Sequence, residues 1–238
     1  MSILEKLNNI CRKITLGDRK TIKSIAKQVK GNVPEIVFSC AEAISGDSIA
    51  YARLMYLIGK KGTSIPDAIF HSKLDDFLRG VFQDEEDRAK MRAFLASEGD
   101  STDNCMQIVS HINNAASKKK IKYLINATRF ALAYDLSLPL YFRVCDAINA
   151  VMEDDLQFLS DNVGAMKNVK TNHFTANIHT QKLFSVSAMR TITTAWEAGD
   201  YAFTPFAKLI DICTVNFDND ARYPNPRRII EEYEEQEN

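Results

Sequence analysis

Histidine is the residue type best suited to acid–base or metal chemistry near neutral pH, and the chain contains four. His173 and His179 are six residues apart, which corresponds to about 20 Å in a strand and to well-separated faces of a helix. We therefore do not expect them to bind one metal ion. His71 precedes Asp75 by four residues, a spacing that predicts a hydrogen-bonded pair on the face of a helix.

Cysteine could supply a nucleophile, but the cysteines of this chain are widely separated. Cys105 lies six residues before His111 with no acid nearby, and this arrangement favours structural residues over a Cys–His nucleophile pair. An odd number of cysteines in apolar surroundings predicts reduced, buried thiols in a cytoplasmic protein. The five cysteines are Cys11, Cys40, Cys105, Cys145 and Cys213.

Carboxylates that converge on a cavity could serve metal-dependent or glycoside chemistry. The acidic segment MEDDLQFLSD instead places Asp154 and Asp161 opposite the apolar stripe of an expected helix, which predicts a solvated face. The segment GKKGTS (59–64) lacks the spacing of a phosphate-binding loop. No metal, dinucleotide or hydrolase motif occurs in the sequence, so we expect neither catalytic residues nor a metal ion or cofactor.

Basic residues gather in two places that could contact phosphate groups. Residues 1–30 contain eight Lys or Arg and two acids, a local charge of +6, although the whole chain has a net charge of −1. The second cluster, SKKKIK (117–122), begins an expected helix, where cations oppose the helix dipole; solvated lysines are its favoured interpretation. The candidate contacts for an anionic partner are Arg12, Lys13, Arg19, Lys20, Lys23, Lys27, Lys118, Lys119, Lys120 and Arg190.

Long helices are expected to position these residues, because nine Gly and six Pro are few for 238 residues. About eight helices are indicated before residue 163. Ser64 and Pro66 mark the start of a helix whose apolar face comprises Ile65, Ile69, Phe70, Leu74, Phe77, Leu78, Val81 and Phe82. The acids of DEEDR suit the start of the next helix, with Met91, Phe94 and Leu95 facing the core. A later stripe runs through Phe142, Cys145, Ile148, Val151, Met152, Leu156 and Leu159.

The fold class expected is mostly α, with a small C-terminal winged-helix-like module that contains a short β element. We predict a helical domain over 1–162, a linker or short strand over 163–180, and the module with its acidic tail over 181–238. The module comprises a helix over about 181–198, an extended piece Tyr201–Thr204, a helix from Pro205, and a terminal acidic helix or frayed tail. The residues expected to pack it together are Trp196, Tyr201, Phe203 and Phe206.

A DNA-reading module should present long polar side chains before its wing. The expected helix over 181–198 has only Gln181, Lys182 and Arg190 for this purpose, and Asp200 occupies the expected wing tip, where a cation would suit phosphate. The charge pattern therefore favours protein interaction or dimerisation over DNA binding.

Several segments resemble a family of bacterial helical proteins without a characterised reaction. The similar runs are IPDAIFHSKLDDFLRGVF, DEEDRAKMRAFL, KKKIKYLINATRFAL, LPLYFRVCDAI and EDDLQFL, within residues 60–217. Such proteins occur among mobile-element and abortive-infection-like phage-defence genes and end in a winged-helix-like segment with the signature Y-x-[FL]-T-P-[FL]-[AG]. Here the signature residues are Tyr201, Phe203, Thr204, Pro205, Phe206 and Ala207. Many winged-helix proteins have Gly where this chain has Ala207. The resemblance implies no catalytic residues.

These observations predict a cytoplasmic, non-enzymatic protein that binds another macromolecule. A protein partner or a second copy of the chain, as a homodimer, is the favoured interpretation, with an accessory role in phage defence or in a mobile element. One alternative is a DNA-binding transcriptional regulator that uses the C-terminal module. A second is an effector that contacts a membrane surface through the basic residues 1–30, since neither a signal segment nor a membrane-spanning run is apparent.

Overall fold

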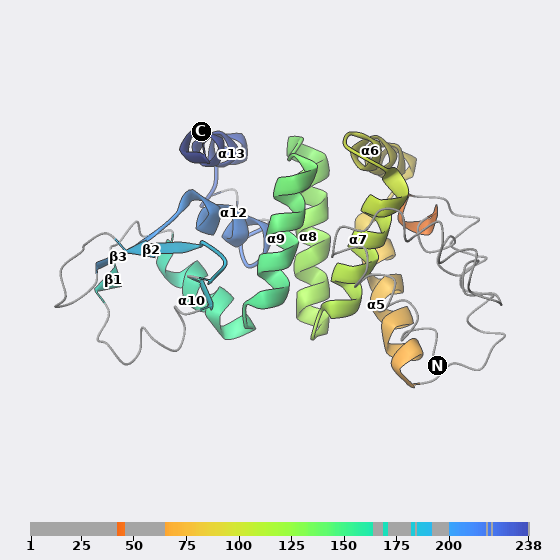
Figure 1. Cartoon of the computed structure of the whole chain (residues 1–238), viewed down its shortest axis with the longest axis horizontal. Coiled ribbons are helices and arrows are strands. Elements are labelled where there is room, and N and C mark those ends of the chain that lie inside the picture. Colours follow the sequence, from red (N-terminus) through yellow and green to blue (C-terminus); the bar gives the residue numbers. More distant parts are fainter. Residues whose placement is uncertain are drawn as a thin grey trace. The chain divides into compact units, whose positions relative to one another are not determined.

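The described part of the chain is mostly helical, which confirms the predicted fold class at that level (Figure 1). The chain divides into two units, Met1–Ile121 (unit 1) and Lys122–Asn238 (unit 2), which we describe separately. No helix among the described residues has the length and apolar character needed to cross a bilayer. A computed structural model describes residues 42–45, 65–163, 169–170, 182–183, 185–191, 200–217, 219 and 221–237.

Three helices make up most of the described part of unit 1. Helix α7 packs against both α5 and α6, and Lys73 Nζ of α5 donates a hydrogen bond to the Asn113 carbonyl of α7 over 3.1 Å. Helix α8 spans the boundary between the two units. The bounds are α5 Ile65–Val81, α6 Glu85–Ala96, α7 Ser101–Asn114 and α8 Lys118–Tyr134.

The predicted apolar face of α5 is largely confirmed, with one error. Ile69 is 53% exposed, because at 100° per residue it lies about 120° from the centre of the buried face. The side chain of Ile65 lies outside the described residues. The buried members are Phe70, Leu74, Phe77, Leu78, Val81 and Phe82.

Helix α6 begins where the run of acidic residues predicted a helix start. Asp84 is its N-cap and accepts a hydrogen bond from the Asp87 amide over 2.9 Å, which satisfies one of the free N–H groups of the first turn. Met91 and Leu95 are buried as expected, and Phe94 is half-buried.

Unit 2 is built around α12, which packs against three other helices and one strand. Its helices are α9 Leu138–Ala150, α10 Glu153–Val163, α12 Pro205–Cys213 and α13 Pro226–Glu237. Its sheet consists of β1 Val169–Lys170, β2 Met189–Thr191 and β3 Asp200–Phe203, antiparallel in the order β1-β3-β2. The buried apolar residues of α12 are Phe206, Ala207, Leu209, Ile210, Ile212 and Cys213.

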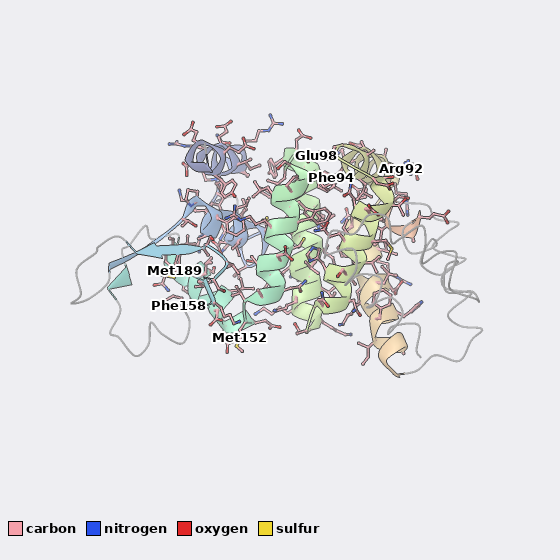
Figure 2. The ribbon with its side chains drawn as sticks, in the orientation of Figure 1. Arg92, Phe94, Glu98, Met152, Phe158 and Met189 are labelled. Carbon is pink, nitrogen blue, oxygen red and sulfur yellow. The ribbon has the colours of Figure 1, made fainter. Side chains whose placement is uncertain are left out.

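The stripe predicted from Phe142 to Leu159 is broken between α9 and α10. Met152 was expected in the core and is 68% exposed, in the turn between the two helices (Figure 2). The side chain of the buried Asp155 accepts a hydrogen bond from the Met152 amide over 3.3 Å. A carboxylate three residues into a helix that binds back to the amide of the N-cap residue starts a new helix, so the chain turns here.

The helix predicted over about 181–198 is wrong over residues 187–191, and residues 192–198 lie outside the described part of the chain. Ser187 adopts a left-handed backbone with φ +62°, and the Ala188 amide bonds to the Leu183 carbonyl over 2.8 Å, as at many helix ends. Strand β2 follows, pairing Arg190 with Ala202 of β3. Within β2 only Thr191 is β-branched, so pairing with β3 rather than local preference accounts for the strand.

The two compact units meet between Ile121 and Lys122, and the domain boundary expected near residue 162 stays a prediction. Helix α12 is buried around most of its circumference and contacts α9, α10 and α13. Strand β1 lies inside the segment predicted as a linker or short strand. The acidic C-terminal segment is a helix rather than a frayed tail, and Ile229, Ile230 and Tyr233 of α13 are buried.

Candidate anion-binding site

The predicted contacts for an anionic partner are only partly visible. Lys118 and Lys119 are exposed in the first turn of α8, whereas Lys120 is 6% exposed, so the cluster is not uniformly solvated. Arg190 lies in β2, a strand at a position where a helix was expected. Arg12, Lys13, Arg19, Lys20, Lys23 and Lys27 lie outside the described residues.

Of the four predicted packing residues, Phe206 is the best defined. It is 1% exposed, and its ring lies 5.7 Å from that of Tyr233 of α13. Phe203 is half-buried at the end of β3, and Tyr201 pairs with residues of both β1 and β2. Trp196 lies outside the described residues. Phe206 therefore joins α12 to α13.

Burial favours the neutral forms of Cys105 and His111 in unit 1. Burial lowers the pKa of His111 to about 4, and burial, followed by the charge of Asp100, raises the pKa of Cys105 to about 12. At pH 7 the pair therefore does not form a thiolate and an imidazolium, which nucleophilic cysteine chemistry requires. Burial also lowers the pKa of His71, and the charge of Asp75 partly offsets this effect.

A buried polar network in unit 2 supports the candidate site. Asp211 of α12 is fully buried. Its carboxylate accepts hydrogen bonds from Tyr223 Oη over 2.5 Å and from Asn216 Nδ2 over 2.9 Å. Arg222 Nε lies 3.3 Å from the same carboxylate and supplies the compensating charge, and its Nη2 donates to the Ser160 carbonyl. Paired in this way, a buried charge is tolerated, and the loop before α13 is fixed to α10 and α12.

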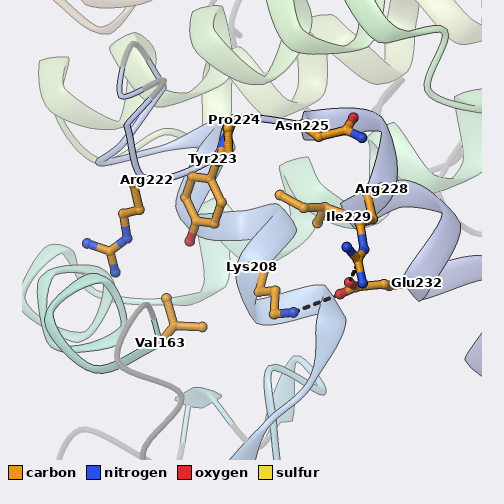
Figure 3. Close-up of a pocket in the computed structure, with 9 residues that line it drawn as sticks. All are labelled: Val163, Lys208, Arg222, Tyr223, Pro224, Asn225, Arg228, Ile229 and Glu232. Atoms are coloured by element: carbon orange, nitrogen blue, oxygen red, sulfur yellow. Dashed lines mark hydrogen bonds and ion pairs between the residues drawn. The ribbon is translucent and has the colours of Figure 1, made fainter.

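Beside this network lies a pocket of about 360 Å³ (Figure 3), within the range of about 300–1,000 Å³ usual for ligand sites. Helix α12 and the following loop supply two cations, Lys208 and Arg222, and α13 supplies Arg228. The other lining residues are Val163, Tyr223, Pro224, Asn225, Ile229 and Glu232. The pocket thus combines three cations and one acid with a partly apolar wall.

A single carboxylate holds two of these cations in place. Glu232 Oε2 lies 2.7 Å from Lys208 Nζ, and Glu232 Oε1 lies 3.2 Å from Arg228 Nε. Figure 3 shows both cations turned towards Glu232, whereas Arg222 lies on the other side of Tyr223 in this view. The hydrogen bond from Lys208 is the main reason that the pKa of Glu232 lies below its usual value.

Helix α13 is fixed to the rest of unit 2 by an aromatic and cationic contact. The Arg143 guanidinium of α9 lies 4.8 Å from the Phe206 ring centroid and 5.5 Å from that of Tyr233, and it donates a hydrogen bond to Tyr233 Oη. Such cation–π contacts favour a defined docking position. The position of α13 determines the pocket, because Arg228, Ile229 and Glu232 belong to it.

The cations of this pocket were not among the predicted site residues. Lys208, Arg222 and Arg228 are separated by 14 and 6 residues, so they form no basic run. The signal that could have found them is Asp211, an acid whose neighbours Ile210 and Ile212 are apolar. A buried acid requires a cationic or hydrogen-bonding partner, and a search for that partner leads to Arg222 and the loop.

No protein-family model matches the chain, and no curated protein or solved structure is significantly similar to it. The resemblance to helical proteins of mobile-element and phage-defence genes therefore stays a prediction.

Proposed function

We propose that this protein acts by binding another macromolecule, and that the pocket between α12 and α13 receives an anionic group of that partner. The observation that carries this proposal is the set of cations in the pocket: Lys208, Arg222 and Arg228. Cations that line a concave surface attract and orient an anionic ligand.

The chemistry of the lining favours binding over catalysis. Burial, followed by the charge of Asp211, raises the pKa of Tyr223, and the pKa of Glu232 is lowered. These groups therefore keep one protonation state near pH 7, whereas general acid–base catalysis is most effective with a group that titrates there.

The favoured partner is a protein, as the charge pattern of the C-terminal module indicates. A nucleic acid is the second candidate, and the observation that favours it is the antiparallel pair β2–β3 leading directly into α12. The winged-helix-like interpretation of the module is part of this proposal, and the arrangement of β2, β3 and α12 supports it. The membrane-surface alternative depends on residues 1–30, which lie outside the described residues.

The proposal can be tested by comparing full-length variants that differ in one charge. Arg228→Gln removes a cation of the pocket, and Arg227→Gln removes its neighbour, which is 64% exposed and pairs with Asp135. Each tagged variant would be used to capture partners from extracts of the native host, with protein and nucleic acid both identified. We expect the functional partner to be retained by the wild type and Arg227→Gln and lost by Arg228→Gln. Equal retention by both variants would overturn the proposal.

A further inference from the structure

The pocket already shows how it holds a carboxylate. Glu232 binds Lys208 through one carboxylate oxygen, at 2.7 Å, and Arg228 through the other, at 3.2 Å. The two cations are therefore separated by a distance that one planar carboxylate can bridge. Glu232 is itself only partly buried, with a side chain 32% exposed, so this carboxylate sits at the rim of the pocket.

Both cations have donors that remain available to a ligand. A lysine ammonium has three N–H groups and an arginine guanidinium has five. In the part of the chain that the structure describes, Glu232 is the one acceptor of both Lys208 and Arg228. The Lys208 side chain is only 21% exposed, and partial removal from water strengthens its attraction for an anion.

The balance of charge favours a monoanion over a phosphate dianion. The three cations of the pocket face two carboxylates, Glu232 and the buried Asp211, which leaves a net charge of +1. A ligand carboxylate neutralises this charge, whereas a phosphate monoester, with a charge of about −1.5 to −2 at pH 7, exceeds it. A binding site and its ligand are usually complementary in charge.

The rest of the lining indicates what accompanies the carboxylate. Val163 and Ile229 are buried aliphatic residues, and Tyr223 turns a ring into the same pocket. A volume of about 360 Å³ exceeds what a lone carboxylate fills. An apolar side chain next to the carboxylate would cover this wall and gain free energy from burial.

We propose that the pocket recognises an acidic peptide segment of a partner protein. Lys208 and Arg228 bind a carboxylate of the segment, and Tyr223 and Ile229 contact an adjacent apolar side chain. Glu232 competes with the incoming carboxylate for the same cations. This inference rests on the function proposed above and names the chemistry of the partner.

The test measures how the full-length protein binds a fluorescein-labelled, C-terminally amidated peptide with the sequence of residues 34–38, PEIVF, which has one carboxylate beside apolar side chains, by fluorescence anisotropy at low salt. Lys208→Gln and Arg228→Gln should each weaken binding about tenfold, since a charge-assisted contact is lost. Arg227→Gln, the matched control outside the pocket, should change affinity less than about twofold. Glu232→Gln should tighten binding about threefold, because the variant removes the competing charge and keeps the side-chain volume.

The sign of the Glu232→Gln effect separates recognition from a structural role. If Glu232 only stabilised α13, its replacement would weaken binding or leave it unchanged, and either result would overturn the proposal. Equal losses for Arg227→Gln and Arg228→Gln, or equal binding of a peptide with its Glu replaced by Gln, would also overturn it. Circular dichroism melting of each variant confirms that the compared proteins are folded.

Two further probes distinguish this inference from the function on which it rests. The same variants are assayed with a labelled DNA duplex and with phosphatidylglycerol vesicles. If either binds in an Arg228-dependent manner while the peptide does not, the carboxylate proposal is wrong and anion binding by the pocket stands. If none of the three probes binds in an Arg228-dependent manner, both proposals are wrong.

Discussion

The buried His111 should make unit 1 sensitive to mild acid. Its side chain is 6% exposed, and burial lowers its pKa from 6.5 to about 4. Between these values the unfolded chain binds a proton that the folded chain does not, so the free energy of unfolding falls as pH decreases. The stability that neutral His111 contributes is fully present above about pH 6.5. At pH 5 the linkage relation gives a decrease in the free energy of unfolding of about 2 kcal/mol.

The measurement is urea unfolding of the full chain at pH 7.5 and pH 5.0, followed by circular dichroism. The control is His111→Gln, which keeps a polar side chain without a titration near neutral pH. The variant should be less stable at both pH values, but its loss between them should be smaller than that of the wild type by about 2 kcal/mol. Carboxylates and His71 titrate in both proteins and cancel in this comparison. If wild type and variant lose equal stability, His111 is not buried in its neutral form and the reasoning fails.

Three other changes test the core of unit 2. Asp211→Ala leaves the Arg222 charge without its carboxylate and should lower the free energy of unfolding by about 3–5 kcal/mol, as measured by urea unfolding. A loss below about 1 kcal/mol would contradict a buried ion pair. Tyr141→Phe removes the 2.9 Å hydrogen bond to Thr128, and the Thr128 hydroxyl keeps its bond to a backbone carbonyl. The expected loss of stability is about 1 kcal/mol, measured by thermal unfolding. A much larger loss would indicate a further role of the Tyr141 hydroxyl. Burial raises the pKa of the Cys145 thiol above its usual 9.0, so the stability that the buried thiol contributes is present below pH 9 and is lost as pH rises further. Cys145→Ala should therefore reduce the fall in the free energy of unfolding at alkaline pH, measured by urea unfolding. An unchanged pH profile would refute this.

The helical part of the fold was accessible from the sequence because local signals agreed with tertiary packing. The start of α5 after Ser64 and the acids around Asp84 mark helix ends that the structure retains. The extended piece predicted over Tyr201–Thr204 corresponds to β3, whereas β2 was missed because Met189 and Ile192 of the sequence also fit an apolar helical period; strand pairing with β3 decides between the two structures. Periodicity alone does not contain that long-range information.

The candidate site was less predictable than the fold for a related reason. Lys208 and Arg228 meet only because α13 docks on α12, and the docking depends on contacts such as that of Arg143 with Tyr233, 90 residues apart. Neither cation stands out locally. Lys208 lies in an apolar helix, and Arg228 belongs to a short Arg-Arg pair that resembles a solvated surface.

The Pro224-Asn225-Pro226 segment gives the docking of α13 a consequence for ligand binding. Tyr223, which precedes this segment, donates a hydrogen bond to Asp211. Pro224 and Asn225 are exposed, and α13 begins at Pro226. Since α13 supplies part of the pocket wall, a ligand can bind there only while this helix is docked, and binding must stabilise the docked helix by the same free energy. An occupied pocket would therefore slow both proteolysis near residues 224–226 and hydrogen exchange along α13, and either rate would measure whether a ligand is bound.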